Sequence, residues 1–137
     1  MIPSFTVNDV PIECINQAAV DYHVPAVLIV SVLKTEDGRN GMASPNKNGT
    51  YDFGPMQINS RWLPRLQQFG ISQHDIQYNP CINVGVGAWI LGTSIADRNQ
   101  LWPGVGDYHS HTWNLNQSYN TKVRMRYEAL NQYLNKP

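Results

Sequence analysis

The order of apolar and polar residues predicts a helix near the start of the chain. Its apolar face recurs at helical spacing through Ile12, Ile15, Ala18, Ala19 and Tyr22. Asn8 or Asp9 stands where a helix cap is expected, and Pro11 falls in the first turn. We therefore expect a helix that begins near Pro11 and packs against the rest of the protein through this face.

Residues 25–35 are apolar almost all round, which is typical of a helix buried on every side. The Val and Ile content of this segment is compatible with a strand as well. Its length and the leading Pro25 favour a helix. The pattern therefore predicts a central buried helix, and Glu36 follows directly at its carboxyl end.

Turn-forming residues dominate residues 38–51, a segment with little apolar content and unusual length for a connection. It is either a functional loop or a flexible one. Beyond it, Asn59 or Ser60 can cap a short helix that carries Pro64 in its first turn. Residues 72–78 form a short link with room for one helical turn.

The second half of the chain predicts two longer helices. Asn79 followed by Pro80 is a helix start, and this helix runs to Arg98. Its glycines are Gly85, Gly87 and Gly92. Each weakens a helix by about 1 kcal/mol relative to alanine, so we expect other helices to approach closely there. Residues 101–116 are expected to be irregular, and a closing helix is expected over about residues 118–135.

Length and composition narrow the classes of function. The 137 residues suit one domain, residues 1–137, around one core. Lys+Arg 10 balance Asp+Glu 10, so we expect no basic surface and no nucleic-acid partner. We expect a monomer.

No apolar run is long enough to span a membrane. Residues 1–5 lack the pattern of a secretory signal, which indicates a mature form with an added Met or export by another route.

Glu36 is the first candidate for chemistry. It ends the buried helix, where the helix dipole is negative and disfavours a carboxylate. The dipole and any burial would raise its pKa toward the value that a general acid needs at neutral pH. The alternative is a surface carboxylate paired with Lys34 or Arg39.

Three segments in order carry a resemblance to a known family. They are Glu36, the run Gly54-Pro55-Met56-Gln57-Ile58-Asn59 and the run Gly106-Asp107-Tyr108-His109-Ser110. The chain resembles the soluble lytic transglycosylase domain, which has a goose-lysozyme-like fold and acts on peptidoglycan. It is most similar to the small transglycosylases that accompany type IV secretion, conjugation and type III secretion machines. The resemblance implies an all-α, lysozyme-like single domain with a central buried helix and a substrate cleft.

The resemblance also implies roles for individual residues. Glu36 would act as the general acid and then as the base, and the hydroxyl of Tyr108 would contact its carboxylate. The residues implied to contact substrate are Met56, Gln57, Asn59, Tyr108, His109 and Tyr119. No cofactor is implied. His109 and His111 lack the further ligands that a metal site needs, so no metal is expected.

The sequence departs from the family pattern beside the acid. Asp37 stands where a Ser commonly follows, Pro55 where Leu or Ile is usual, and His109 where Asn is common. Asp37 either raises the pKa of Glu36 by like-charge repulsion or faces solvent.

The two cysteines are expected to form a disulfide. The implied substrate lies outside the cytoplasm, so we expect a periplasmic protein, and disulfides persist in that compartment. Cys81, near the start of its helix, would then be joined to Cys14 on the first helix. The alternative is two buried free thiols.

The implied activity is cleavage of peptidoglycan between N-acetylmuramic acid and N-acetylglucosamine, with formation of a 1,6-anhydromuramic acid end. The implied partners are glycan strands and components of a type IV or type III secretion machine. A hydrolytic muramidase would need a second carboxylate, for which Asp52 is the candidate. A non-catalytic wall-binding assembly factor is a further alternative, and the presence of Glu36 argues against it.

Overall fold

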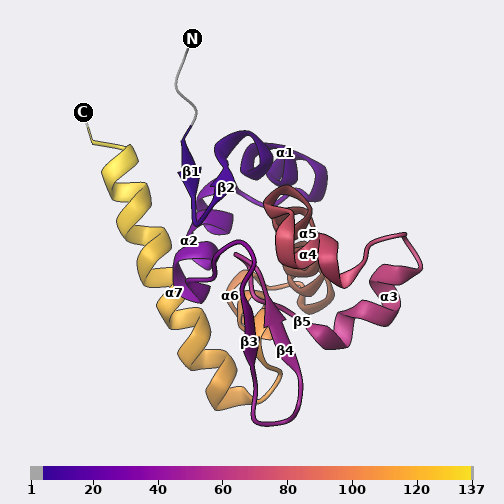
Figure 1. Cartoon of the computed structure of the whole chain (residues 1–137). Helices are drawn as coiled ribbons and strands as arrows, with labels where there is room; N and C mark the ends of the chain where they lie inside the picture. The colour runs from indigo at the N-terminus through magenta and orange to yellow at the C-terminus, as the bar shows by residue number, and fades with distance from the viewer. Residues whose placement is uncertain (1–4, 137) are drawn as a thin grey trace.

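The computed structural model describes residues 5–136 of the chain. Helices make up most of this part, as the pattern predicts, and short strands pair in two places (Figure 1). The helices are α1 (Ile12–Tyr22), α2 (Ala26–Glu36), η1 (Ser60–Trp62, a 3-10 turn), α3 (Leu63–Gln67), α4 (Gln73–Tyr78), α5 (Pro80–Arg98), α6 (Leu101–His109) and α7 (Trp113–Leu134). The strands are β1 (Thr6–Val7), β2 (Val10–Pro11), β3 (Ala43–Pro45), β4 (Tyr51–Phe53) and β5 (Ile58–Asn59).

Helix α2 forms the centre of the core. Its fully buried apolar side chains are Leu28, Ile29, Val32 and Leu33. Helix α2 packs against α1 and α7, while α5 and α6 pack against each other and against α1 and α7 respectively. The prediction of a central buried helix is confirmed. Helix α2 ends at Glu36, and Asp37 after it takes the left-handed conformation with φ 55°.

The amino-terminal residues form a hairpin where a helix cap was expected. Strands β1 and β2 pair antiparallel, with Val7 opposite Val10. Asn8 and Asp9 form the two-residue turn, with φ of 51° and 70°. Positive φ at both central positions matches the twist of a tight two-residue hairpin. The prediction of a cap at Asn8 or Asp9 is therefore wrong, and α1 begins at Ile12.

A three-stranded antiparallel sheet begins within the segment that was expected to be a loop. Strand β4 lies between β3 and β5. Asp52 in β4 lies opposite Ser44 on one side and Asn59 on the other. The connection between β3 and β4 is thus a hairpin tip with a paired base, and it projects beyond the helices in Figure 1.

Two glycines of α5 lie where neighbouring elements come close. A Cβ at Gly87 would lie 2.5 Å from Cε of Met56, and one at Gly92 would lie 2.9 Å from the carbonyl oxygen of Tyr22. Nothing lies within 4 Å of such an atom at Gly85. The expectation of a close helix therefore holds at Gly92, which meets the end of α1, while the close neighbour of Gly87 belongs to the turn at residues 54–57 and Gly85 has none.

The structure differs from the prediction near the carboxyl end. Residues 101–109 form helix α6 in place of an irregular segment. A Cβ at Gly104 would lie 2.5 Å from the Cα of Ile95, so this glycine permits α6 to pack closely on α5. Helix α7 begins at Trp113, earlier than the expected start near residue 118.

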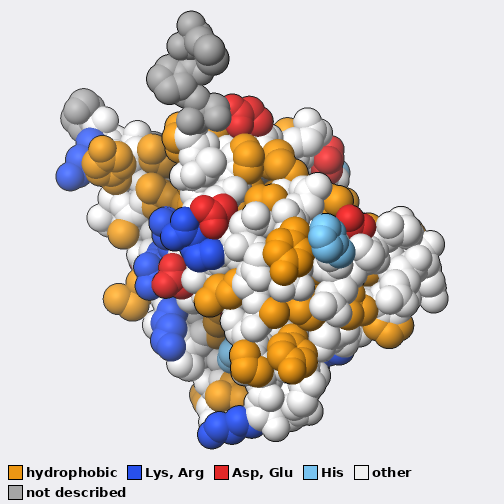
Figure 2. Space-filling model, viewed as in Figure 1, with side chains coloured by type: hydrophobic (Ala, Val, Ile, Leu, Met, Phe, Trp, Pro, Cys, Tyr) orange, Lys and Arg blue, Asp and Glu red, His pale blue; other side chains and the backbone are white. Residues whose placement is uncertain are grey.

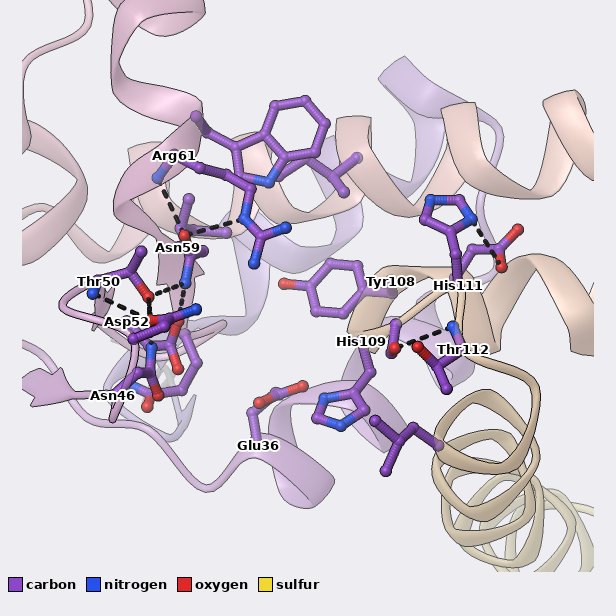
Figure 3. A pocket seen from close by; sticks show the side chains of 18 of the residues that line it. Glu36, Asn46, Thr50, Asp52, Asn59, Arg61, Tyr108, His109, His111 and Thr112 are labelled. Atoms are coloured by element: carbon purple, nitrogen blue, oxygen red, sulfur yellow. Dashed lines mark hydrogen bonds and ion pairs between the residues drawn. The ribbon is translucent and has the colours of Figure 1, made fainter.

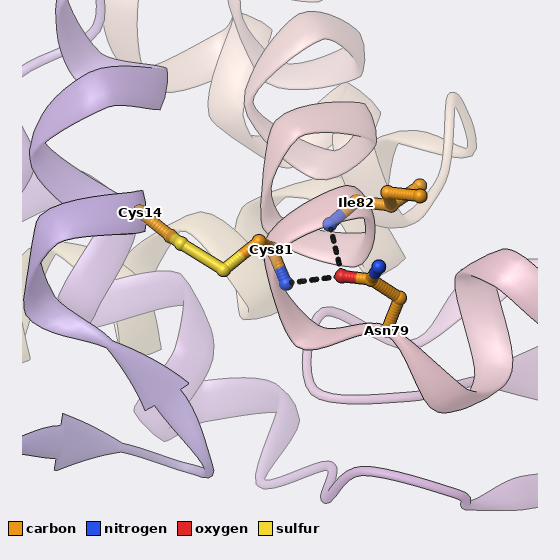
Figure 4. The surroundings of a disulfide bond; sticks show 4 residues. All are labelled: Cys14, Asn79, Cys81 and Ile82. Atoms are coloured by element: carbon orange, nitrogen blue, oxygen red, sulfur yellow. Dashed lines mark hydrogen bonds between the residues drawn. A yellow bond between two sulfur atoms is a disulfide. The ribbon is translucent and has the colours of Figure 1, made fainter.

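A disulfide joins α1 to the start of α5. Cys14 and Cys81 are bonded, with Cα atoms 5.3 Å apart, and this confirms the predicted pair (Figure 4). The side-chain oxygen of Asn79 accepts hydrogen bonds from the backbone N–H groups of Cys81 and Ile82, each at 3.1 Å. The predicted cap therefore fixes the helix start beside the disulfide.

No single helix among residues 5–136 combines the length and the apolar character of a membrane span. Helices α1 and α2 reach that length only together, across a bend of 119°. On the face shown in Figure 2, basic side chains lie beside acidic ones on the α7 side of the molecule.

Candidate active site

A cleft of about 670 Å³ opens at the carboxyl end of α2 (Figure 3). Its walls come from the three-stranded sheet with its hairpin tip, from η1, and from the end of α6 with the residues after it. The expected site residues that line it are Glu36, Gln57, Asn59, Tyr108 and His109. Met56 and Tyr119 instead lie behind its wall, with exposed fractions of 0% and 7%.

Glu36 is partly buried in this cleft. Its Oε2 accepts a hydrogen bond from the hydroxyl of Tyr119 at 2.6 Å. Burial raises the pKa of Glu36 from its ordinary value of 4.5 to about 7; the hydrogen bond from Tyr119 opposes this rise, and the charge of Asp52 adds to it. A carboxyl group with this pKa can both give and take a proton at neutral pH.

The tyrosine that contacts the acid is not the predicted one. The hydroxyl of Tyr108 donates to the carbonyl oxygen of Met56 at 2.7 Å, and Tyr119 contacts Glu36 in its place. The ring of Tyr119 stacks on that of His109, with centroids 4.9 Å apart, and lies nearly parallel to that of Tyr108 at 6.3 Å. Tyr119 therefore orients the acid from behind the cleft, while Tyr108 holds the neighbouring turn.

The turn at residues 54–57 is fixed by a residue that the sequence analysis missed. Asn83 of α5 is fully buried, and its Nδ2 donates to the carbonyl oxygens of Phe53 and Ile76 at 2.9 and 2.8 Å. Its Oδ1 accepts from the backbone N–H of Met56 at 2.8 Å. A polar residue between Ile82 and Val84 was the available signal. Met56 thus serves the turn through its backbone, while its side chain belongs to the core.

Gln57 lines the cleft with φ 53°. Its Nε2 donates to the carbonyl oxygen of Gly54 at 3.0 Å. Gly38, two residues after the acid, packs so closely on this turn that a Cβ there would lie 2.8 Å from the carbonyl oxygen of Pro55. The turn after Glu36 and the turn that carries Gln57 therefore contact each other backbone to backbone.

Asn59 organises the opposite wall of the cleft. Its Nδ2 donates to Oδ1 of Asp52 at 2.9 Å and to Oγ1 of Thr50 at 3.0 Å. Its Oδ1 accepts from the backbone N–H and from Nε of Arg61, at 3.0 and 3.1 Å (Figure 3). The predicted cap is confirmed, because the contact to the Arg61 backbone starts η1. The same amide fixes two other side chains of the cleft.

The β1–β2 hairpin supports the turn after Glu36. Asn8 is a buried residue, 8% exposed. Its Nδ2 donates to the carbonyl oxygens of Gly38 at 2.9 Å and Leu33 at 3.3 Å. Asp9 binds the guanidinium group of Arg39 through two hydrogen bonds of 2.7 and 2.9 Å. Arg39 is therefore paired away from Glu36, and the alternative of a Glu36–Arg39 ion pair is wrong. An Asn-Asp pair flanked by two valines was the overlooked hairpin signal.

Comparison with known proteins identifies the family. The family model described as the Transglycosylase SLT domain matches residues 13–133. The chain belongs to this family. The predicted lysozyme-like helical fold is thereby confirmed.

Individual relatives of this SLT domain are similar over most of the chain. The invasion protein IagB of Salmonella typhimurium (strain SL1344) is 32% identical over 108 residues, which cover 78% of this chain and 68% of that protein. The protein IpgF of Shigella flexneri is 32% identical over 101 residues, covering 73% of this chain and 66% of that protein. The peptidoglycan-binding-like protein of Escherichia coli O157:H7 is 28% identical, covering 90% and 81%.

The second carboxylate that acts on the acid of this SLT domain is Asp52. Asp37 is exposed, and its charge acts on the guanidinium group of Arg39. Asp52 lines the cleft from the sheet, and its charge raises the pKa of Glu36. Of the two alternatives for Asp37, the structure therefore supports the one in which it faces solvent.

The two histidines at the end of α6 differ in surroundings. Burial lowers the pKa of His109, whose ring stacks on Tyr119. Nδ1 of His111 lies 3.3 Å from Oδ1 of Asp107, which is also bound by Arg98. Within residues 5–136, no three His, Cys, Asp or Glu side chains converge on a point where a metal ion would fit.

Proposed function

We propose that this SLT domain is a lytic transglycosylase that cleaves peptidoglycan between N-acetylmuramic acid and N-acetylglucosamine and leaves a 1,6-anhydromuramic acid end. The observation that supports this function is Glu36, which lines the cleft with a pKa of about 7 and is oriented by Tyr119. Because Tyr119 binds Oε2, Oε1 is left for the substrate.

Glu36 acts first as the general acid. It donates its proton to the glycosidic oxygen as the bond from that oxygen to the anomeric carbon breaks. The N-acetyl oxygen of the muramic acid residue meets the positive charge at the anomeric carbon. Ionised Glu36 then takes the proton of the O6 hydroxyl, whose oxygen attacks the anomeric carbon and displaces the N-acetyl oxygen. The carboxyl group ends protonated, as it began, and no water is consumed.

A hydrolytic muramidase is the second candidate, and Asp52 is the observation that favours it. Asp52 lines the same cleft and acts electrostatically on Glu36. Two carboxylates flanking one bond are what a hydrolytic glycosidase uses. One oxygen of Asp52 is already bound by Asn59 at 2.9 Å, which makes Asp52 a part of the sheet as well.

Digestion of purified sacculi in oxygen-18 water tests both candidates. Mass spectrometry of the released muropeptides should find unlabelled 1,6-anhydro ends. Stoichiometric label at a new reducing end would identify a muramidase and direct attention to Asp52. Glu36→Gln should abolish cleavage with either outcome, because the amide is nearly isosteric but cannot transfer the proton. Residual activity within about tenfold of wild type would remove Glu36 from its role.

The cellular role that we assign is local opening of the cell wall, in the periplasm, for a secretion or conjugation apparatus. The name of one relative, an invasion protein, supports a role of this kind. The test is secretion by a strain that lacks the gene, complemented with the wild-type chain or with Glu36→Gln. Only the wild-type chain should restore secretion. Equal rescue by both would favour a non-catalytic assembly factor.

A further inference from the structure

The cleft holds two cationic side chains that the proposed chemistry does not use. Lys47 lies at the tip of the β3–β4 hairpin, and Arg61 lies in η1. Figure 3 shows the guanidinium group of Arg61 directed into the cleft, toward the side on which Tyr108 and Glu36 lie. The proposed cleavage of a glycosidic bond between neutral sugar rings does not require the positive charge of either side chain.

Arg61 is held in place by its own wall of the cleft. Its Nε donates to Oδ1 of Asn59 at 3.1 Å, and Asn59 is itself fixed by Asp52 and Thr50. The amide of Asn59 must point this way, because its NH₂ group donates to Asp52 on the other side. Arg61 is exposed, and among the described residues its two terminal nitrogens have no hydrogen-bond partner, so they can reach a ligand in the cleft.

No carboxylate among the described residues lies within ion-pair distance of Arg61. Other arginines of the chain have partners: Arg39 binds Asp9, Arg98 binds Asp107, and Arg124 binds Glu128. Arg65, in the next helix, lies over the ring of Trp89 at 4.9 Å. Arg61 thus combines a side chain tethered to the cleft wall through Nε with a charge that no described carboxylate neutralises, which suits a site for an anion.

We infer that Arg61 binds a carboxylate carried by the lactyl arm of N-acetylmuramic acid. This inference rests on the proposed function, because that arm lies beside the scissile bond of peptidoglycan. The carboxylate is either one of the peptide stem or, where the stem has been removed, that of the lactyl group itself. A planar guanidinium group matches a carboxylate through two parallel hydrogen bonds, which a lysine cannot reproduce. The site makes the enzyme selective for charged glycan strands.

Three substrates test the inference. They are soluble strands with their stems, strands freed of stems by an amidase, and the stem-bearing strands with every carboxylate converted to a neutral amide. The wild-type chain is compared with Arg61→Gln and Arg61→Lys for kcat/KM and for binding of each strand. Arg126→Gln, an exposed arginine of α7 outside the cleft, is the matched control for loss of one positive charge.

Arg61→Gln should lower both kcat/KM and affinity about tenfold or more on a carboxylate-bearing strand and leave the amidated strand unaffected. Arg61→Lys should fall between the two, and Arg126→Gln should match wild type. A loss confined to stem-bearing strands assigns the stem carboxylate, and a loss confined to amidase-treated strands assigns the lactyl carboxylate. Equal behaviour of wild type and Arg61→Gln on all three strands, or an equal loss on all three, would overturn the inference.

The same measurements separate this inference from the proposed function. Failure of the wild-type chain to cleave any strand would remove the transglycosylase activity. The binding data would still decide the carboxylate site, because they need no turnover. Cleavage of all strands with no dependence on charge would keep the activity and remove the site.

Discussion

Replacing Glu36 with Gln should stabilise the protein at neutral and alkaline pH, because ionising a partly buried carboxyl group carries a cost that an amide lacks. In the folded chain the pKa of Glu36 is about 7, against an ordinary value of 4.5. Between these pH values the folded chain holds a proton that the unfolded chain has released. The free energy of unfolding of the wild type therefore falls as the pH rises through this window. The amide does not titrate, so the variant escapes this fall.

The size of the effect follows from the two pKa values. One pKa unit corresponds to about 1.4 kcal/mol, so the wild type should lose up to about 3 kcal/mol relative to the variant between pH 4.5 and about 7. The amide oxygen can still accept the hydrogen bond from Tyr119, so this contact of 2.6 Å should persist. Below the window the two proteins should be about equally stable, and above it the difference should be complete.

Urea unfolding followed by circular dichroism, at pH values below, within and above the window, measures this difference. Glu128→Gln is the matched control, because Glu128 is exposed on α7 and pairs with Arg124 at 2.9 Å. A difference between wild type and Glu36→Gln that stays the same at every pH would refute the reasoning. Glu36 would then titrate as a solvated carboxylate, and its role as an acid at neutral pH would lose its physical basis.

Three further variants test the contacts around the site. Tyr119→Phe removes a hydrogen bond that lowers the pKa of Glu36, so the alkaline limb of the kcat profile should move to higher pH; an unmoved limb would contradict the contact. Tyr108→Phe should lower the free energy of unfolding by about 1–2 kcal/mol in urea and leave that limb in place, because its hydroxyl binds a backbone carbonyl group. The double variant Cys14→Ser, Cys81→Ser should lower the free energy of unfolding in urea by about 4 kcal/mol. A loss below about 1 kcal/mol would show that the disulfide contributes little to stability.

The helices that sequence reasoning located correctly are those whose signals are local. Pro80 after Asn79 predicts the start of α5, and the apolar run after Pro25 predicts α2. Helix α6 is not evident from the sequence, because Pro103, Gly104 and Gly106 are residues that commonly interrupt helices. Gly104 is instead required by the contact with Ile95, which lies in another helix and leaves no trace in the local pattern.

Sequence reasoning predicted Glu36 as the candidate acid and located only some of the residues that contact it. A carboxylate at the end of a buried helix makes Glu36 a candidate, and the two motifs that follow it in family order favour it over a surface carboxylate. Whether Tyr108 or Tyr119 reaches it depends on how α6 and α7 cross α2, which spacing along the chain does not encode. Asn83 was missed for the same reason, since its partners lie in segments far away in the sequence.

The contacts that hold Glu36 in place also offset the cost of its position. Ionised Glu36 destabilises the fold by up to about 3 kcal/mol, and it does so at a helix end that its own dipole makes unfavourable for a negative charge. The side chain of Asn8 donates hydrogen bonds to backbone carbonyl oxygens before and after that helix end, at Leu33 and Gly38. Asp9 binds Arg39 and so holds the segment that follows the helix. The disulfide, which spans a sequence separation of 67, contributes about 4 kcal/mol at a distance from the cleft. These contacts stabilise the fold without adding charge or solvent beside the carboxylate. Glu36 therefore keeps the raised pKa on which the proposed proton transfer depends.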